Sequence, residues 1–162
     1  MIRRRMVLQA AAIVAAAPGA ALSQAPNGAG MPMRFAAALS AHDIDAFAAL
    51  FADDYVNHQM SAAALPPPAG ASPKVATVAF FAARLKGLPD LKVSIETMLE
   101  QDDRVAASFV YEGTHQGQYF GVAPTGRRLR FTSCDIFRLA GGRIAEHWGM
   151  GDIAGVLAQL KG

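Results

Sequence analysis

The fold of this 162-residue chain is decided near its C-terminal end, where residues 127–162 read RRLRFTSCDIFRLAGGRIAEHWGMGDIAGVLAQLKG. Apolar and polar side chains alternate over residues 128–139, which predicts a β-strand with one buried face. A glycine pair then forms a turn, residues 143–151 predict a second strand, and residues 152–160 have the spacing of an amphipathic helix. Ionisable side chains in such strands require explanation, because burying an unpaired charge costs several kcal/mol.

Alternation within these two strands predicts which side chains share a face. Asp135 shares its face with apolar residues, namely Leu129, Phe131, Phe137 and Leu139. In the second strand Trp148 alternates with His147, which therefore lies on the opposite face unless a β-bulge re-aims it. Because successive antiparallel strands usually pair, we expect Asp135, His115 and the Trp148 region to line one concave face.

The preceding chain supplies helices and two further strands. Helical spacing of apolar residues predicts helices over 32–40, 44–51 and 73–86, and period-two alternation predicts strands over 91–99 and 104–115. A long loop with three consecutive prolines lies between a short extended piece at 55–58 and the third helix. Because the helices are segregated from four antiparallel strands, the sequence predicts an α+β domain with a curved sheet wrapped over helices.

The N-terminus predicts export. Residues 1–23 combine three arginines, an Ala-rich apolar run and small residues before a cleavage point, which is typical of a bacterial signal peptide. The Arg4-Arg5 pair also fits a twin-arginine signal. A linker over 24–31 and one domain over 32–162 would follow. We expect a periplasmic or secreted protein with no stable membrane association after cleavage.

Charge and motifs exclude several function classes. Without residues 1–23 the chain has 12 basic and 13 acidic residues, a formal charge of −1, which gives no basis for nucleic-acid binding. The sequence contains one cysteine, so no intrachain disulfide forms. It contains no phosphate-binding or dinucleotide-binding loop, and no zinc or serine-hydrolase signature.

A family resemblance joins these pieces. The segments HDIDAFAALFADDYVNH, FVYEGTHQG, APTGRRLRF and GGRIAEHWGMGDIAGVLAQL resemble the SnoaL-like polyketide cyclase or ester cyclase group of the nuclear transport factor 2-like superfamily. The resemblance implies a cone-shaped fold, a pocket between the helices and a bent antiparallel sheet, and a homodimer. It also implies a small apolar substrate closed by an aldol-type reaction, without metal or cofactor.

The resemblance implies roles for particular residues. An acidic side chain moves the proton in such cyclases, and the resemblance implies Asp135, His147 and Asp152 as the acid/base candidates here. The candidates for binding the substrate are Tyr55, Asn57, His58, His115, Tyr119 and Trp148.

Structural roles compete with these assignments. Asp135 could pair with an arginine, Asp152 is placed to cap the last helix, and His147 could face solvent.

The sequence is compatible with two alternative functions. The first is an exported enzyme of cyclase, isomerase or hydrolase type, which uses a pocket carboxylate or histidine for metal-free acid/base catalysis. The second is a non-catalytic periplasmic module that binds a small apolar ligand. Convergence of Asp135, His147 and Asp152 on one place would favour the enzyme. If Asp152 only caps the last helix and Asp135 only pairs with an arginine, the enzyme hypothesis would be disfavoured.

Overall fold

The computed structural model describes residues 28, 30–59 and 69–162. The expected signal segment 1–23 lies outside these residues, as do most of the expected linker 24–31 and the triple-proline part of the loop. Within the described ranges, no helix combines the length and apolar character that crossing a membrane requires.

Four helices are observed close to the expected positions, at α1 (Gly30–Ser40), α2 (Ile44–Ala49), α3 (Pro73–Gly87) and α4 (Ile153–Lys161). Each of the last three begins after a side chain that accepts a backbone N–H of the first turn, from Asp43, Ser72 and Asp152 respectively. Such a cap typically contributes about 1 kcal/mol to helix stability. Helix α1 begins at Gly30, inside the stretch expected as linker.

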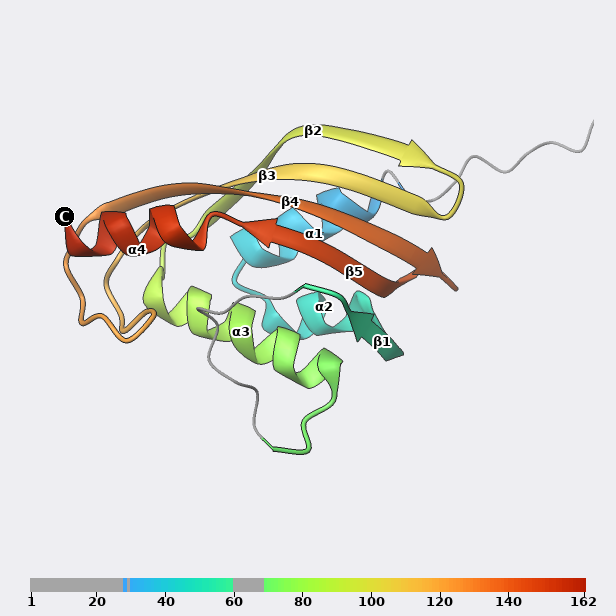
Figure 1. The fold of residues 1–162 in the computed structure, drawn as a ribbon, viewed down its shortest axis with the longest axis horizontal. Helices are drawn as coiled ribbons and strands as arrows, with labels where there is room; N and C mark the ends of the chain where they lie inside the picture. The colour runs from blue at the N-terminus through green and yellow to red at the C-terminus, as the bar shows by residue number, and fades with distance from the viewer. Residues whose placement is uncertain (1–27, 29, 60–68) are drawn as a thin grey trace, which may run out of the picture.

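The sheet has five strands, β1 (Phe51–Asn57), β2 (Lys92–Gln101), β3 (Arg104–Thr114), β4 (Arg128–Ala140) and β5 (Arg143–Gly151). Their order is β1-β5-β4-β3-β2, and β2 to β5 form the expected antiparallel series. Figure 1 shows this sheet bent over α1, α2 and α3, with α4 beside one end. The mixed α+β architecture is therefore confirmed.

The edge strand β1 differs from the sequence prediction, which places Phe51 in the second helix. Phe51 instead starts a strand, and β1 pairs in parallel with β5, from Phe51 opposite Ile144 to Asn57 opposite His147. Pairing with the open edge of β5 satisfies backbone groups that a longer α2 would have satisfied internally. This parallel strand positions Tyr55 and Asn57 beside the centre of β5.

An aromatic cluster fixes the helices to the sheet. The ring of Phe35 in α1 lies 5.0–5.4 Å, centroid to centroid, from those of Phe47, Phe81, Phe109 and Phe137. These rings come from three helices and two strands, and edge-on or offset pairs of this kind contribute about 0.5–1.5 kcal/mol each beyond their burial. The core therefore holds the inner face of the sheet in a fixed position relative to α3.

A β-bulge in β5 places its side chains on faces other than those predicted from the sequence. Leu139 pairs with Ile144, whereas Arg138 pairs with Glu146, so one extra residue lies in β5 between these pairs. The extra residue shifts the alternation, and His147 now lies opposite the buried Phe137. The expectation that Trp148 shares the face of Asp135 is wrong, because Trp148 is opposite the outward-facing side chain of residue 136.

Candidate active site

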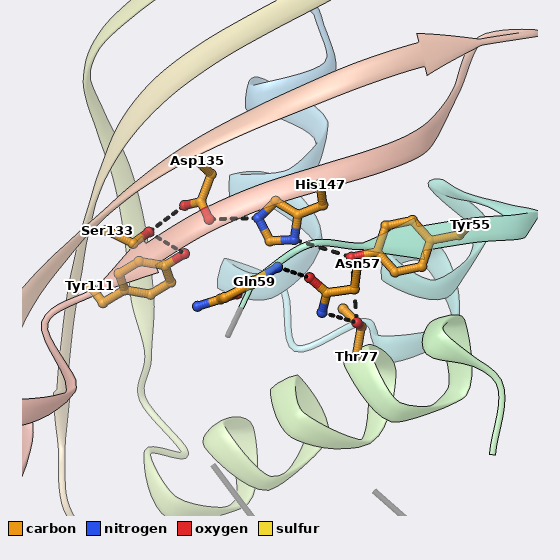
Figure 2. A network of polar contacts seen from close by, with 8 residues as sticks. All are labelled: Tyr55, Asn57, Gln59, Thr77, Tyr111, Ser133, Asp135 and His147. Carbon is orange, nitrogen blue, oxygen red and sulfur yellow. Dashed lines mark hydrogen bonds and ion pairs between the residues drawn. The ribbon is translucent and has the colours of Figure 1, made fainter. Parts of the chain in front are cut away.

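A buried carboxylate–histidine pair lies at the centre of the inner sheet face. Asp135 of β4 and His147 of β5 are 4% and 1% exposed, and Asp135 Oδ1 is 2.7 Å from His147 Nε2 (Figure 2). Two neighbouring antiparallel strands carry them, and the bulge in β5 turns the histidine inward. The core side chains around them exclude water, so each polar atom of the pair needs a partner within the protein.

The second nitrogen of His147 also has a partner. The hydroxyl of Tyr55 in β1 lies 3.1 Å from His147 Nδ1, and the hydroxyl of Thr77 in α3 donates to Tyr55 at 3.5 Å. Asn57 Nδ2 donates to Thr77 Oγ1 at 3.1 Å, which extends the chain of contacts to the edge of the domain. Burial raises the pKa of Tyr55, so this phenol stays protonated and can donate to Nδ1. The proton of a neutral His147 then lies on Nε2 and points to Asp135.

The other oxygen of Asp135 is held by Ser133, two residues earlier on the same face of β4. Ser133 Oγ lies 2.5 Å from Asp135 Oδ2 and 3.3 Å from the Tyr111 hydroxyl. A serine hydroxyl has one proton, and the shorter contact assigns it to the carboxylate, so Tyr111 donates to Ser133 Oγ. Burial raises the pKa of Tyr111, and the negative charge of Asp135 raises it further. Tyr111 is therefore a neutral hydroxyl at the site.

Gly149 leaves room for the pair. It is opposite Asp135 in the β4–β5 ladder, and a Cβ atom at this position would lie 2.5 Å from Asp135 Oδ1 and 2.6 Å from His147 Nε2. The same Cβ would lie 3.0 Å from Gln59 Oε1. Any larger residue would therefore displace the carboxylate–histidine contact, and glycine is required by space rather than by backbone conformation.

The arrangement suits proton transfer by a carboxylate. Both ring nitrogens of His147 are used, one by Asp135 and one by Tyr55, whereas each carboxylate oxygen of Asp135 accepts one hydrogen bond and retains a further lone pair. Asp135 is therefore the group able to face a ligand, and His147 and Ser133 orient it. Of the three predicted acid/base residues, the structure brings together Asp135 and His147.

Asp152 lies apart from this pair and acts as a helix cap. Its Oδ1 accepts the backbone N–H of Gly155 at 2.8 Å, and its own backbone N–H bonds to Thr132 O. The structural alternative foreseen for Asp152 is thus the observed contact. Asp135, in contrast, lies within 4.0 Å of no arginine in the described chain, where its ion pair is with His147.

Two of the predicted substrate-binding residues lie on the outer sheet face. The rings of His58 and Trp148 stack at 4.4 Å with an interplanar angle of 2°. His58 Nε2 lies 2.7 Å from Glu146 Oε2, and Arg138 Nε donates to the other oxygen of Glu146 at 2.6 Å. Since these side chains are on the face opposite Asp135, they do not contact the buried pair.

His115 is completely buried at the end of β3. The backbone N–H of Thr125 donates to His115 Nδ1 at 3.2 Å, so Nδ1 is an acceptor and the neutral ring has its proton on Nε2. In the described structure His115 Nε2 has no hydrogen-bonding partner. This donor fits the predicted binding role, although no contact joins it to Asp135.

Five residues of the site region were not among the predicted site residues, namely Thr77, Arg84, Tyr111, Ser133 and Gly149. Ser133 alternates with Asp135, so strand periodicity alone could have placed it at the site. Helical spacing puts Thr77 and Arg84 on the buried face of α3 with Phe81. The role of Gly149 depends on cross-strand register, which no local pattern determines.

No group of three or more His, Cys, Asp or Glu side chains suited to a metal ion is found among residues 28, 30–59 and 69–162. His58, His115 and His147, which could have met in space, lie on different faces or in separate contacts.

Comparison with known proteins supports the fold and the resemblance to the SnoaL-like family. The family model for SnoaL-like polyketide cyclase matches residues 31–160. IdmH, a proposed polyketide cyclase from Streptomyces antibioticus, is 28% identical with a TM-score of 0.70, and the match covers 83% of this chain and 98% of IdmH. AclR, a proposed hydroxylase from Streptomyces galilaeus, is 25% identical with a TM-score of 0.69 over 82% of this chain and 94% of AclR.

A proposed SnoaL-like polyketide cyclase from Jannaschia sp. CCS1 shares the fold with a TM-score of 0.68, at 20% identity over 83% of this chain and 91% of its own. No curated protein matches the sequence.

Proposed function

The chain belongs to the SnoaL-like polyketide cyclase family, and from this premise we propose that Asp135 is the proton carrier of a small-molecule enzyme. The observation that carries the proposal is the buried Asp135–His147 contact, with both histidine nitrogens occupied and a carboxylate lone pair left for a ligand. Family membership supports small-molecule enzyme chemistry, and the contact supports a particular residue for it.

The proposed reaction is proton transfer at carbon next to a carbonyl group. Asp135 removes a hydrogen α to the carbonyl, and the C–H electron pair moves into the enolate. In a ring closure the enolate carbon then bonds to a second carbonyl carbon of the same molecule, and the proton held by Asp135 returns to the alkoxide oxygen. His147 and Ser133 hold the carboxylate in position through both steps, and Tyr55 keeps His147 in the tautomer that donates from Nε2.

The first half of this reaction can be tested without knowing the natural substrate. β-Tetralone is an apolar bicyclic ketone with acidic α-hydrogens, and their replacement by deuterium in heavy water is followed by proton NMR. We expect the protein to accelerate exchange and Asp135→Asn to abolish the acceleration. Binding of the ketone without faster exchange would contradict the enzyme proposal and favour the non-catalytic binding module.

We also propose that residues 1–23 direct export. The three arginines and the apolar run that follows support this, and the Arg4-Arg5 pair supports the twin-arginine route. Mass spectrometry of the protein expressed in a bacterial host is expected to show a periplasmic species that begins near Gln24. A cytoplasmic species that keeps residues 1–23 would contradict the proposal.

A further inference from the structure

Arg84 is a buried cation that makes no direct ion pair with a carboxylate in the described part of the chain. It lies on the inner face of α3 and is 5% exposed. Among the described residues, no Asp or Glu oxygen lies within 4.0 Å of its guanidinium. Removing an ion from water costs several kcal/mol even after relaxation, so an arginine in this position normally has an anionic partner.

The surroundings of Arg84 are aromatic. Its Cζ atom lies 4.7–5.2 Å from the ring centroids of Phe80, Phe81, Tyr111 and Phe131. Each such contact contributes about 0.5–2 kcal/mol, which offsets part of the cost of desolvating the guanidinium. The faces of these rings do not accept hydrogen bonds from the N–H groups in the guanidinium plane.

Of the five N–H bonds of the guanidinium, the contacts within the described chain assign one, from Nε to the Tyr119 hydroxyl at 3.0 Å. Burial works to lower the pKa of Arg84, whereas its contacts with Tyr119 and Tyr111 and the negative charge of Asp135 raise it, so the charge is kept.

Tyr111 connects this cation to the carboxylate–histidine pair. The guanidinium packs on the Tyr111 ring, and the hydroxyl of the same ring contacts Ser133, which holds Asp135. Arg84 and Asp135 are therefore connected through the side chains of Tyr111 and Ser133.

From these contacts we propose that Arg84 is the anchor for a carboxylate group on a flat, apolar substrate. The planar guanidinium matches the two oxygens of a carboxylate, and the surrounding rings match an aromatic or polycyclic body. The inference rests on the proposed function, because it places the reacting carbon of the same molecule at Asp135. It adds the substrate class, an aromatic or polycyclic acid rather than a neutral apolar molecule.

Binding of two matched probes tests the anchor. Naphthoate and naphthamide have the same bicyclic body and nearly the same shape, and only the first has a negative charge. By isothermal titration calorimetry we expect the wild-type protein to bind naphthoate at least about tenfold more tightly than naphthamide. In Arg84→Met, which keeps the volume of the side chain and removes its charge, we expect equal affinities. Equal affinities in the wild type, or a preference that survives in Arg84→Met, would overturn the proposal.

Two further variants keep the test decisive. If Arg84→Met does not fold, Arg84→Lys keeps the charge but loses the planar fork that matches a carboxylate, and an undiminished naphthoate preference in that variant would count against the anchor. Asp135→Asn is expected to retain the naphthoate preference while losing deuterium exchange on β-tetralone. In the wild-type protein, accelerated exchange without a naphthoate preference would sink the anchor alone, and a naphthoate preference without accelerated exchange would sink the proton carrier alone.

Discussion

Strand β5 contributes one member to each of two carboxylate–histidine pairs, which lie on opposite faces of the sheet. On the inner face His147 meets Asp135 at 2.7 Å, and on the outer face Glu146 meets His58 at the same distance. The side chains of His147 and Asp135 are 2% and 6% exposed, whereas those of His58 and Glu146 are 37% and 25% exposed. The residue types and distances are alike, so burial distinguishes the pairs.

Burial changes what each pair can do. Hydrogen bonds from His58 and Arg138 lower the pKa of Glu146, which keeps that carboxylate ionised and bound to its neighbours. Water screens such exposed pairs, and they contribute little to stability. The inner pair is isolated from water and is supported by Ser133 and Tyr55, so its charge acts at full strength on a bound molecule. The comparison predicts that function depends on the inner pair alone.

The largest effect is expected from neutralising the inner carboxylate. Asp135→Asn keeps the size of the side chain but removes the base, so exchange of deuterium into β-tetralone should fall by about 10²–10⁴-fold. Glu146→Gln makes the same chemical change on the outer face and should leave exchange within about twofold of wild type. Equal losses of exchange activity in Asp135→Asn and Glu146→Gln would contradict the prediction that function depends on the inner pair alone.

A steric change tests the geometry of the inner pair. Gly149→Ala places a Cβ atom within 2.6 Å of both Asp135 Oδ1 and His147 Nε2. We expect it to abolish exchange and to lower the free energy of unfolding by about 1–3 kcal/mol, measured by urea titration. The matched control is Gly151→Ala, whose Cβ would approach no atom closer than 3.8 Å. If Gly149→Ala is as active as the control, the close contact is not needed.

A smaller effect is expected from the partner of the histidine. Tyr55→Phe removes the hydroxyl that contacts His147 Nδ1 and leaves that buried nitrogen unpaired within the described structure. The free energy of unfolding should fall by about 1–3 kcal/mol in urea titration. His58→Gln on the outer face is the control, and it should change stability much less. Unaltered stability in Tyr55→Phe would show that Nδ1 does not depend on the tyrosine.

The smallest effect concerns pH and the outer pair. The pKa of Glu146 is lowered from its ordinary value of 4.5 in the folded protein, so its contribution to stability is present above pH 4.5. That contribution is lost as pH falls through the folded-state pKa. Glu146→Gln should therefore lower Tm by roughly 4 °C or less near neutral pH, and the difference should vanish in acid. A difference that grows in acid would contradict this sign.

Much of the architecture follows from local patterns in the sequence. The alternation around Asp135 places that residue on the buried face of β4, and the structure agrees because a strand with one apolar face has a single stable orientation. Helix starts are equally local, since Ser72 and Asp152 accept the N–H groups of their own first turns. Export and the homodimer stay predictions.

Other features depend on register and on contacts between distant segments. The bulge in β5 reverses the expected faces of His147 and Trp148, and it arises where β4 and β5 pair rather than from either strand alone. Parallel pairing of β1 brings Tyr55 to His147 across 92 positions of sequence. Arg84 lies beside Phe80 and Phe81 of its own helix, and packing against the sheet adds the rings of Tyr111 and Phe131.

The sequence by itself therefore determined the α+β class, the approximate positions of the helices and of β2 to β5, and the buried orientation of Asp135, because each depends on the periodicity of a single segment. The tertiary structure alone decided that His147 meets Asp135, that Asp152 caps α4 beyond the reach of this pair, and that Arg84 has no carboxylate partner in the described chain. These outcomes depend on strand register and on which side chains surround a buried group. Both are set by contacts between segments far apart in sequence, which local periodicity does not encode.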